Sequence, residues 1–461
     1  MGNYQGYQKY KDSGVEWLGE IPEHWEVIRI KFSTYVKGRV GWHGLNSKEF
    51  LYEGDFYLVT GTDFKNRTVN WESCYRITEE RYEEDPYIHL QEKDILITKD
   101  GTIGKVVQVK NIPYKASVNS GVFVTRPLKN KHYKDDYMFY VLASNIFHEF
   151  INLQKSGTTI SHLYQNVFEN FQYPFPPLDE QEKIAQFLDY KTKQIDELIK
   201  KKETLIEKLD EKRTALISHA VTKGLDSSVP MKDSGIEWLG NIPKHWTILK
   251  LGRLCDVTKL TGFEYTKKWE TDPNGEIIAL RGFNIKNNQL ILNDVERITS
   301  ELSNELLRSK LYAGDIVFPC TGTLGEGAII DDDNKYHINQ NIAKISPVKN
   351  IDRKFLLLSL CSKNMKYQIE LYNSSGLQPV LLIGTIRSLI ISIPDFLEQK
   401  QIAQYLDKKT AQIDLQKAKI KQAIELLKEY RTSLITNAVT GKIDVSQIAI
   451  PSPQKPQPQK G

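Results

Sequence analysis

Two stretches of the chain carry apolar residues at spacings of three, four and seven, with lysine and glutamate between them. They cover residues 176–222 and 394–441. This spacing places the apolar residues on one face of a helix, and each stretch is long enough for roughly 60 Å of helix at about 1.5 Å per residue. Because such a face is not stable in water, we expect the two helices to pair, antiparallel if the halves of the chain are related by a pseudo-twofold.

The remaining parts of the chain alternate short apolar runs with glycine, asparagine, aspartate and proline. Runs such as DILIT and VVQV in residues 27–173, and DIVF and AII in residues 247–393, predict strands. Residues 136–154 and 352–372 have the length and the apolar spacing of helices. We therefore predict an α+β fold, in which two mixed α/β domains alternate with the two long helices.

The pattern occurs twice because the chain contains an internal repeat. KDSGVEWLGEIPEHW at Lys11 returns as KDSGIEWLGNIPKHW at Lys232, an offset of 221 residues. EQEKIAQFLD at Glu180 returns as EQKQIAQYLD at Glu398, an offset of 218. In contrast, GDFYLVTGTDF and GEIIALRGFNI share only their two glycines. A repeated frame with different contents indicates two similar readers of two different things.

The repeated entry predicts a structural clamp rather than a catalytic site. Trp17, Leu18, Ile21 and Trp25 are apolar anchors around a turn at Gly19. Such anchors are suited to fixing a chain segment against a domain. We therefore expect function where the two copies disagree.

The repeat divides the chain into six segments. The C-terminal segment is rich in proline and glutamine, so we expect it to be disordered. In chain order, the segments are an entry segment with the first mixed domain (1–175), the first long helix (176–222), a linker with the repeated entry segment (223–246), the second mixed domain (247–393), the second long helix (394–441) and the tail (442–461).

Composition restricts the classes of function. Apolar residues make up 40% of the 461 residues and charged residues 26%, which is typical of globular proteins. The net charge of +4 argues only weakly for a polyanionic partner, so any nucleic-acid surface must be local. The four cysteines form no C-x-x-C pair, which disfavours a zinc site or a disulfide framework. Because no run of about 18 apolar residues occurs, we expect a cytoplasmic protein without a membrane partner.

Two motifs suggest chemistry that their spacing does not support. PDFLEQK at Pro394 contains the Pro-Asp and Glu-x-Lys of metal-dependent nucleases, but two intervening residues cannot place both carboxylates on neighbouring strands around one ion. We interpret it as the start of a helix. DGTIGK at Asp100 has too few residues between its glycines for a phosphate-binding P-loop, and valine follows its lysine. We expect a tight turn between strands there, and the sequence offers no catalytic constellation.

Loops rich in basic and polar residues are the remaining candidates for a site. Arginine and lysine can pair with guanine, and asparagine and glutamine with adenine, when a loop enters the major groove. Lysines beside the glycine-rich turn could contact a DNA backbone. For every candidate, the alternative is an ordinary solvated surface residue. The candidate DNA-binding residues are Arg39, Lys65, Asn66, Arg67, Lys99, Lys105, Thr158, Thr159, His162, Lys259, Arg281, Asn284, Lys286 and Gln378.

Three doubled motifs resemble those of a known family. They are the SG(V/I)EWLG(E/N)IP(E/K)HW entry, the EQ-x-x-IAQ(F/Y)LD opening of each long helix and its RT(A/S)LI(S/T)(H/N)AVT close. In this combination the chain resembles the specificity subunit of Type I restriction and modification systems. The resemblance covers about residues 11–445 and is specific, because several motifs occur twice in the same order.

The resemblance implies a non-catalytic reader of double-stranded DNA. Each mixed domain would be a target recognition domain for one half of a bipartite site, and the helical pair would fix the half-site spacing. The helices would dock two methyltransferase subunits, and translocating nuclease subunits would join for restriction. No cofactor is implied in this chain, because the methyltransferase would use S-adenosylmethionine and the nuclease ATP and Mg. The candidate partner-docking residues are Ile184, Leu188, Ile195, Leu205, Ile402, Leu406, Ile413 and Ile420.

Two other classes of function remain open at this point. A stand-alone DNA-modifying enzyme would need motifs of its own, and the chain has neither an N/D-P-P-Y/F methylase signature nor a Walker motif. A coiled-coil scaffold that binds only protein would need no basic loops in its mixed domains.

Overall fold

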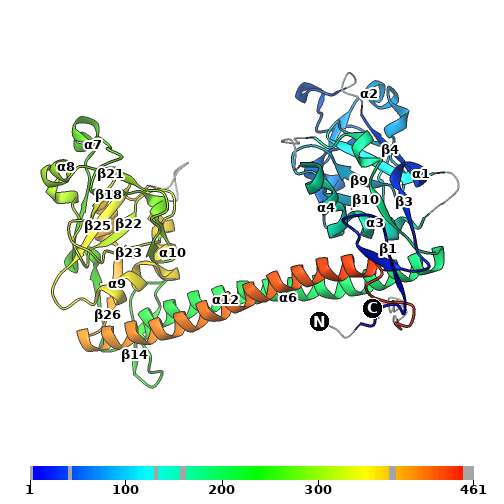
Figure 1. Ribbon diagram of the computed structural model, residues 1–461. Coiled ribbons are helices and arrows are strands. Elements are labelled where there is room, and N and C mark those ends of the chain that lie inside the picture. The colour runs from blue at the N-terminus through cyan, green and yellow to red at the C-terminus, as the bar shows by residue number, and fades with distance from the viewer. Residues whose placement is uncertain (1–3, 40–43, 129–132, 156–161, 373–379, 450–461) are drawn as a thin grey trace. The chain divides into compact units, whose positions relative to one another are not determined.

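The computed structural model describes residues 4–39, 44–128, 133–155, 162–372 and 380–449. The chain forms two compact units. Met1–Lys202 with Gln422–Gly461 make up unit 1, and Glu203–Lys421 make up unit 2. Each unit contains one mixed domain and parts of both long helices, α6 (Leu178–Lys223) and α12 (Phe396–Val439), which are drawn in green and orange in Figure 1. The boundary between the units therefore falls inside the helices.

The two predicted long helices are confirmed, with 46 residues in α6 and 44 in α12. Within unit 2 they are joined by ion pairs between Asp210 and Lys417 and between Arg213 and Asp414. Residue numbers rise on α6 as they fall on α12, so the helices run antiparallel there, as expected. The pairing buries apolar residues that an isolated helix of this length would leave in water.

The mixed domain of unit 1 is built on two sheets. Its N- and C-terminal strands, β3 and β13, pair at the base of the domain, beside the start of α6. Because β3 and β13 are antiparallel neighbours, the domain begins and ends at one place. The larger sheet has the order β4 (Thr34–Gly38), β12 (Val122–Pro127), β9 (Ile95–Thr98), β10 (Val106–Gln108), β7 (Thr68–Val69) and β6 (Phe64–Lys65); the smaller has the order β11 (Ala116–Val118), β5 (Phe56–Val59) and β8 (Tyr75–Ile77); the base pair is β3 (Glu26–Arg29) with β13 (Gln172–Phe175).

The larger sheet of unit 1 is buried on both faces. Ile95 and Ile97 of β9 pack with the helices, whereas Leu96 packs in a second core with the smaller sheet. Successive side chains of a strand point to opposite faces, so an uninterrupted apolar run such as DILIT fits this position. The helices on and around these sheets are α1 (Ile30–Ser33), α2 (Glu79–Glu83), α3 (Asp135–Leu142), α4 (Asn145–Lys155) and α5 (Gln165–Phe168).

Unit 2 repeats this plan with different residues. Its larger sheet also separates two cores, because Ile316 and Phe318 pack with helices while Val317 packs on the other face. The strands are β17 (Cys255–Lys259), β25 (Ile342–Pro347), β22 (Ile316–Pro319) and β23 (Ala328–Ile329) in one sheet; β21 (Glu296–Ile298), β18 (Ile277–Leu280) and β24 (Tyr336–Ile338) in the second; β19 (Ile285–Lys286) with β20 (Gln289–Leu290); and β16 (Thr247–Lys250) with β26 (Ile390–Ile393) at the base.

Each helix predicted inside a mixed domain is two helices. The breaks fall at Ser144 and at Ser362. The Ser362 hydroxyl accepts a hydrogen bond from the Met365 N–H, at 3.2 Å, and thereby starts a new helix. Residues 352–372 therefore contain α9 (Arg353–Leu360) and α10 (Lys363–Tyr372), the counterparts of α3 and α4; the other helices of unit 2 are α7 (Gly262–Lys268), α8 (Ser300–Glu305) and α11 (Ile383–Ser388).

The repeated entry segment clamps the start of each long helix. In unit 1 it forms the antiparallel pair β1 (Tyr10–Asp12) and β2 (Glu20–Pro22). The Trp25 indole N–H donates to the Glu180 carboxylate at 2.9 Å, and a His24 ring nitrogen lies 2.7 Å from it. In unit 2, β14 (Met231–Asp233) pairs with β15 (Asn241–Pro243), and the same contacts join His245, Trp246 and Glu398.

The predicted disorder of residues 442–461 is wrong for the part that the structure describes. The Ile443 and Val445 side chains are 6% and 2% exposed and belong to the core of unit 1. The Asp444 N–H also donates to the Gln5 carbonyl at 2.8 Å. Apolar residues before the proline-rich end thus continue the fold, and residues 450–461 lie outside the described residues.

Candidate nucleic-acid interface

A short hairpin presents basic residues at equivalent places in both units. In unit 1, β6 and β7 are joined by Asn66 and Arg67, with φ angles of 47° and 72°. Asparagine tolerates this left-handed conformation better than most residues, and the turn matches the twist of a hairpin. Lys65 and Asn66 are exposed, and so is Lys286 on β19 of unit 2. Three of the predicted candidates therefore lie on accessible surface.

Arg67 serves the fold and is not a free contact for DNA. Its guanidinium donates to Asp189 at 3.0 Å and to Thr192 at 3.2 Å, both on α6. It also lies 4.7 Å from the ring centroids of Phe139 and Tyr140 on α3. These contacts fix the hairpin to two helices, which corrects the prediction for this residue.

Replacing Arg67 by asparagine, the residue that unit 2 has at the equivalent position, is expected to loosen the hairpin. The variant keeps a residue that tolerates a positive φ but loses the charge-assisted hydrogen bonds to Asp189. We expect the local opening free energy of residues 64–70 to fall by about 1–3 kcal/mol, measured by hydrogen exchange. Lys65→Gln removes a charge from the same hairpin and should leave this protection unchanged; equal losses in both variants would contradict the locking role of Arg67.

The DGTIGK motif forms the predicted turn between strands. It joins the antiparallel strands β9 and β10, and Gly101 and Gly104 have φ angles of 64° and 86°. Lys105 at its end is exposed. Lys99 at its start is half-buried, with its Nζ 5.2 Å from the centroid of the Phe123 ring, and burial lowers the pKa of its ammonium group. Lys105 is therefore the more accessible cation of the pair.

Of the remaining loop candidates of unit 1, one is bound to another side chain and two lie outside the described residues. His162 is half-buried, and its ring nitrogen Nδ1 bonds with Asp100. Its ring also lies 4.8 Å from that of Tyr164. His162 thus ties its segment to the glycine-rich turn. Thr158 and Thr159, together with Gln378 of unit 2, lie outside the described residues.

The prediction that Arg39 lies on a DNA-facing surface is wrong. Its side chain is 2% exposed and donates to the Val118 carbonyl and to the Ser117 hydroxyl, each at 3.3 Å. Burial lowers the pKa of its guanidinium. The equivalent position in unit 2 is Leu260, which is also buried, so this is a core position in both copies.

Asn284 and Arg281 also have structural roles. The Asn284 side chain is 1% exposed, and its amide donates to the carbonyls of Ile291 and Asp294 at 2.9 and 2.8 Å. Arg281 forms ion pairs with Asp294 at 3.2 Å and with Glu296 at 3.0 Å. The prediction that Asn284 contacts DNA is thus wrong, and Arg281 is bound within its own domain. Lys259, on β17, is half-buried.

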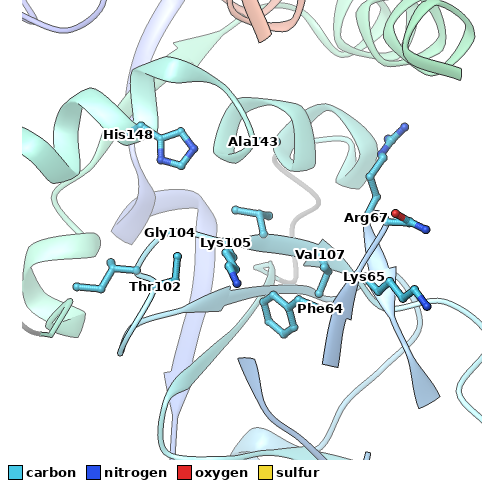
Figure 2. A pocket seen from close by; sticks show the side chains of 12 residues that line it. Phe64, Lys65, Arg67, Thr102, Gly104, Lys105, Val107, Ala143 and His148 are labelled. Carbon is cyan, nitrogen blue, oxygen red and sulfur yellow. The ribbon is translucent and has the colours of Figure 1, made fainter. Parts of the chain in front are cut away.

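The hairpin and the glycine-rich turn of unit 1 enclose a pocket with a cavity volume of about 340 Å³. Figure 2 shows Lys105 on the turn, Lys65 on the hairpin and His148 descending from α4 on the facing side. His148 is not predictable as a pocket residue from the sequence, because one histidine on an amphipathic helix carries no signal of its own. Its counterpart under the offset of 218 is a lysine, Lys366. A basic residue at this position in both copies is the one signal in the sequence.

The apolar residues proposed to dock partner subunits are mostly buried inside the units. In unit 1 they pack against the mixed domain and the end of α12, and in unit 2 against the second mixed domain. Leu205 is 47% exposed and Ile420 is half-buried, so these two remain on the helix surface. The prediction is wrong for those at most 7% exposed, namely Ile184, Leu188, Ile195, Ile402, Leu406 and Ile413.

Two general features of the described residues concern metals and membranes. In the part of the chain that the structure describes, no three His, Cys, Asp or Glu side chains gather closely enough to hold a metal ion. Among the same residues, no helix has the length and apolar character needed to cross a bilayer.

The chain thus contains two mixed domains with the same plan, and each is joined to a long helix. The family model of the type I restriction modification DNA specificity domain matches residues 22–208 and 243–426, once for each copy. The chain belongs to this family, whose members provide DNA recognition in type I systems while other subunits supply catalysis.

Relatives agree with this assignment over nearly the whole chain, and two solved structures share the fold. A type I restriction enzyme MjaVIII specificity subunit from Methanocaldococcus jannaschii is 28% identical over 96% of this chain and 98% of its own. A chain from a structure of a type I R-M system covers 92% of this chain and 99% of its own, with a TM-score of 0.67 at 14% identity. The HsdS subunit from Thermoanaerobacter tengcongensis covers 92% and 98%, with a TM-score of 0.51 at 15% identity.

Proposed function

We propose that each mixed domain reads one half of a bipartite target in double-stranded DNA, and that the two long helices set the spacing of the half-sites. One observation carries the proposal: the two copies keep the same frame and differ in their exposed loops. The clamps around Glu180 and Glu398 are the same, whereas the glycine-rich turns read DGTIGK in unit 1 and TGTLGE in unit 2 and differ at the exposed Lys105. Side chains on accessible loops are the groups that can distinguish base edges.

Partner subunits would supply the chemistry in this proposal. Two methyltransferase subunits using S-adenosylmethionine would bind the long helices, one for each copy, and nuclease subunits using ATP and Mg would join for restriction. This chain would itself hold no cofactor. Large apolar side chains exposed on a helix suit a protein interface. In the middle of α6 and α12 these include Leu198, Leu205, Leu415 and Leu426, which are 43–58% exposed.

Exchange of one mixed domain tests the proposal. Residues 27–173 are replaced by the equivalent domain of a relative, with junctions inside the β3–β13 pair, where Val27 lies opposite Pro174. We expect one half of the methylated sequence to change and the other half to remain, as mapped by methylation sequencing of host DNA. Exchange of residues 247–393 is the matched control and should change only the other half. If both halves or neither changed, the domains would not read independently.

A further inference from the structure

The pocket of unit 1 is cationic. Of the twelve residues that line it, Lys65, Arg67, Lys105 and His148 are basic, and none is acidic. The Arg67 guanidinium is bound to Asp189, but Lys65 and Lys105 are exposed. In Figure 2 the Lys105 and His148 side chains come from facing elements, the turn and α4. The pocket therefore favours an anion electrostatically.

Unit 2 contains a carboxylate at the corresponding place. Glu326 follows the second glycine-rich turn, and its carboxylate accepts a hydrogen bond from the Asn287 backbone N–H at 3.1 Å. The Lys366 ammonium on α10 lies 3.5 Å from the same carboxylate. A hairpin N–H and a helix-borne cation thus bind one anionic group.

Unit 1 keeps the hairpin N–H and a basic residue on the equivalent helix, but no carboxylate lines its pocket. The offset of 221 residues relates Asn66 to Asn287 and Lys105 to Glu326, and the offset of 218 relates His148 to Lys366. Among the described residues, the Asn66 N–H has no hydrogen-bond acceptor. Both turns also approach their helices closely, because a Cβ at Gly104 or Gly325 would meet Ile151 or Lys366 within 3 Å. The arrangement of turn, hairpin and helix is therefore shared, and unit 1 has Lys105 where unit 2 has the Glu326 carboxylate.

We infer that the pocket of unit 1 binds a backbone phosphate of DNA, at the place where unit 2 holds its own Glu326 carboxylate. This rests on the proposed function, since it assumes that the mixed domain lies on DNA. A backbone N–H and lysine ammonium groups are the usual partners of phosphate oxygens and carry no base information. The subsite thus positions the first domain on its half-site, and the second domain has no equivalent contact.

Salt dependence of DNA binding tests the subsite. The full chain is assembled with its methyltransferase partner, and the affinity for a duplex carrying its mapped target is measured over a salt series. Lys105→Gln should reduce the slope of log K against log [salt] by about 0.9, the value for one phosphate. This corresponds to a roughly threefold smaller loss of affinity between about 50 and 200 mM salt. Glu326→Lys should open the equivalent place in unit 2 and steepen the slope by a similar amount.

Lys110→Gln is the matched control, because Lys110 is an exposed lysine of the same domain outside the pocket. An unchanged slope in Lys105→Gln, or an equal change in Lys110→Gln, would overturn the phosphate subsite. A change in which bases are methylated would also overturn it, because a phosphate contact is sequence-independent. These outcomes would leave the proposed half-site reading intact, provided that the wild-type complex discriminates its target. Half-site reading itself is tested by the domain exchange.

Discussion

Replacing Trp25 by alanine is expected to lower the free energy of unfolding of unit 1 by about 3–5 kcal/mol. The side chain is 0% exposed, and its indole N–H donates to Glu180 at 2.9 Å. The Tyr7 ring packs against it with a centroid distance of 5.6 Å, and the Tyr7 hydroxyl donates to the same carboxylate. Burial raises the pKa of Tyr7, so this hydroxyl stays protonated and remains a donor. Removing the indole therefore leaves both a cavity and a weakened clamp.

Hydrogen exchange of the amides in β3, β13 and α3 measures this loss separately from unit 2. Trp246→Ala, the equivalent change, should reduce protection in unit 2 by a similar amount, because Trp246 is also 0% exposed. Tyr52→Ala removes an aromatic side chain that is 86% exposed and should have little effect. A loss below about 1 kcal/mol in Trp25→Ala would mean that the entry segment does not clamp the domain.

Local, repeated signals made the frame of this protein predictable from sequence. The long helices were expected at residues 176–222 and 394–441 and occur at Leu178–Lys223 and Phe396–Val439. Their periodicity extends over many turns, so no single polar interruption hides it. The internal repeat adds a second sample of every element, which is why the turn at Asp100 was also correctly predicted.

The roles of polar loop residues could not be predicted in the same way, because burial is a tertiary property. Lys65 and Arg67 lie in the hairpin of unit 1 and Asn284 lies just before the hairpin of unit 2, yet only Lys65 is exposed. The repeat contains one signal that Asn284 is buried. Asn284 corresponds to Asp63, which is also buried and accepts hydrogen bonds from the Thr60 N–H and the Ser73 hydroxyl. A short amide or carboxylate after a glycine in both copies indicates a capping side chain rather than a base contact.

The apolar face of the long helices and their pairing were predicted correctly, but the cover that the mixed domains provide was not. Ile184 and Leu188 on α6 are 0% exposed because the first mixed domain and the end of α12 cover them. A heptad pattern indicates that a face is buried and does not distinguish an intrachain partner from another subunit. Leucines that stay exposed on the long helices, such as Leu205, indicate better which part of the helix surface is open to another subunit.

Replacing Gln181 by leucine is expected to lower the stability of unit 1 by about 2–4 kcal/mol, although the side chains are similar in volume. Gln181 is 0% exposed. Its amide oxygen accepts a hydrogen bond from the Lys134 N–H at the start of α3, and its amide nitrogen donates to the Pro176 carbonyl. Leucine would leave the buried Pro176 carbonyl and the part-buried Lys134 N–H without these partners. A buried unsatisfied group costs about 1–3 kcal/mol.

The chain provides matched controls for this substitution. Gln399→Leu should cause a similar loss in unit 2, because its amide bonds with the Asp352 N–H and the Pro394 carbonyl. Gln186→Leu changes the same residue type on an exposed face of α6 and should alter stability by less than about 0.5 kcal/mol. Denaturant unfolding followed by hydrogen exchange in α3 and α9 separates the two units. If Gln181→Leu were as stable as Gln186→Leu, the repeated EQ motif would not join each long helix to its domain.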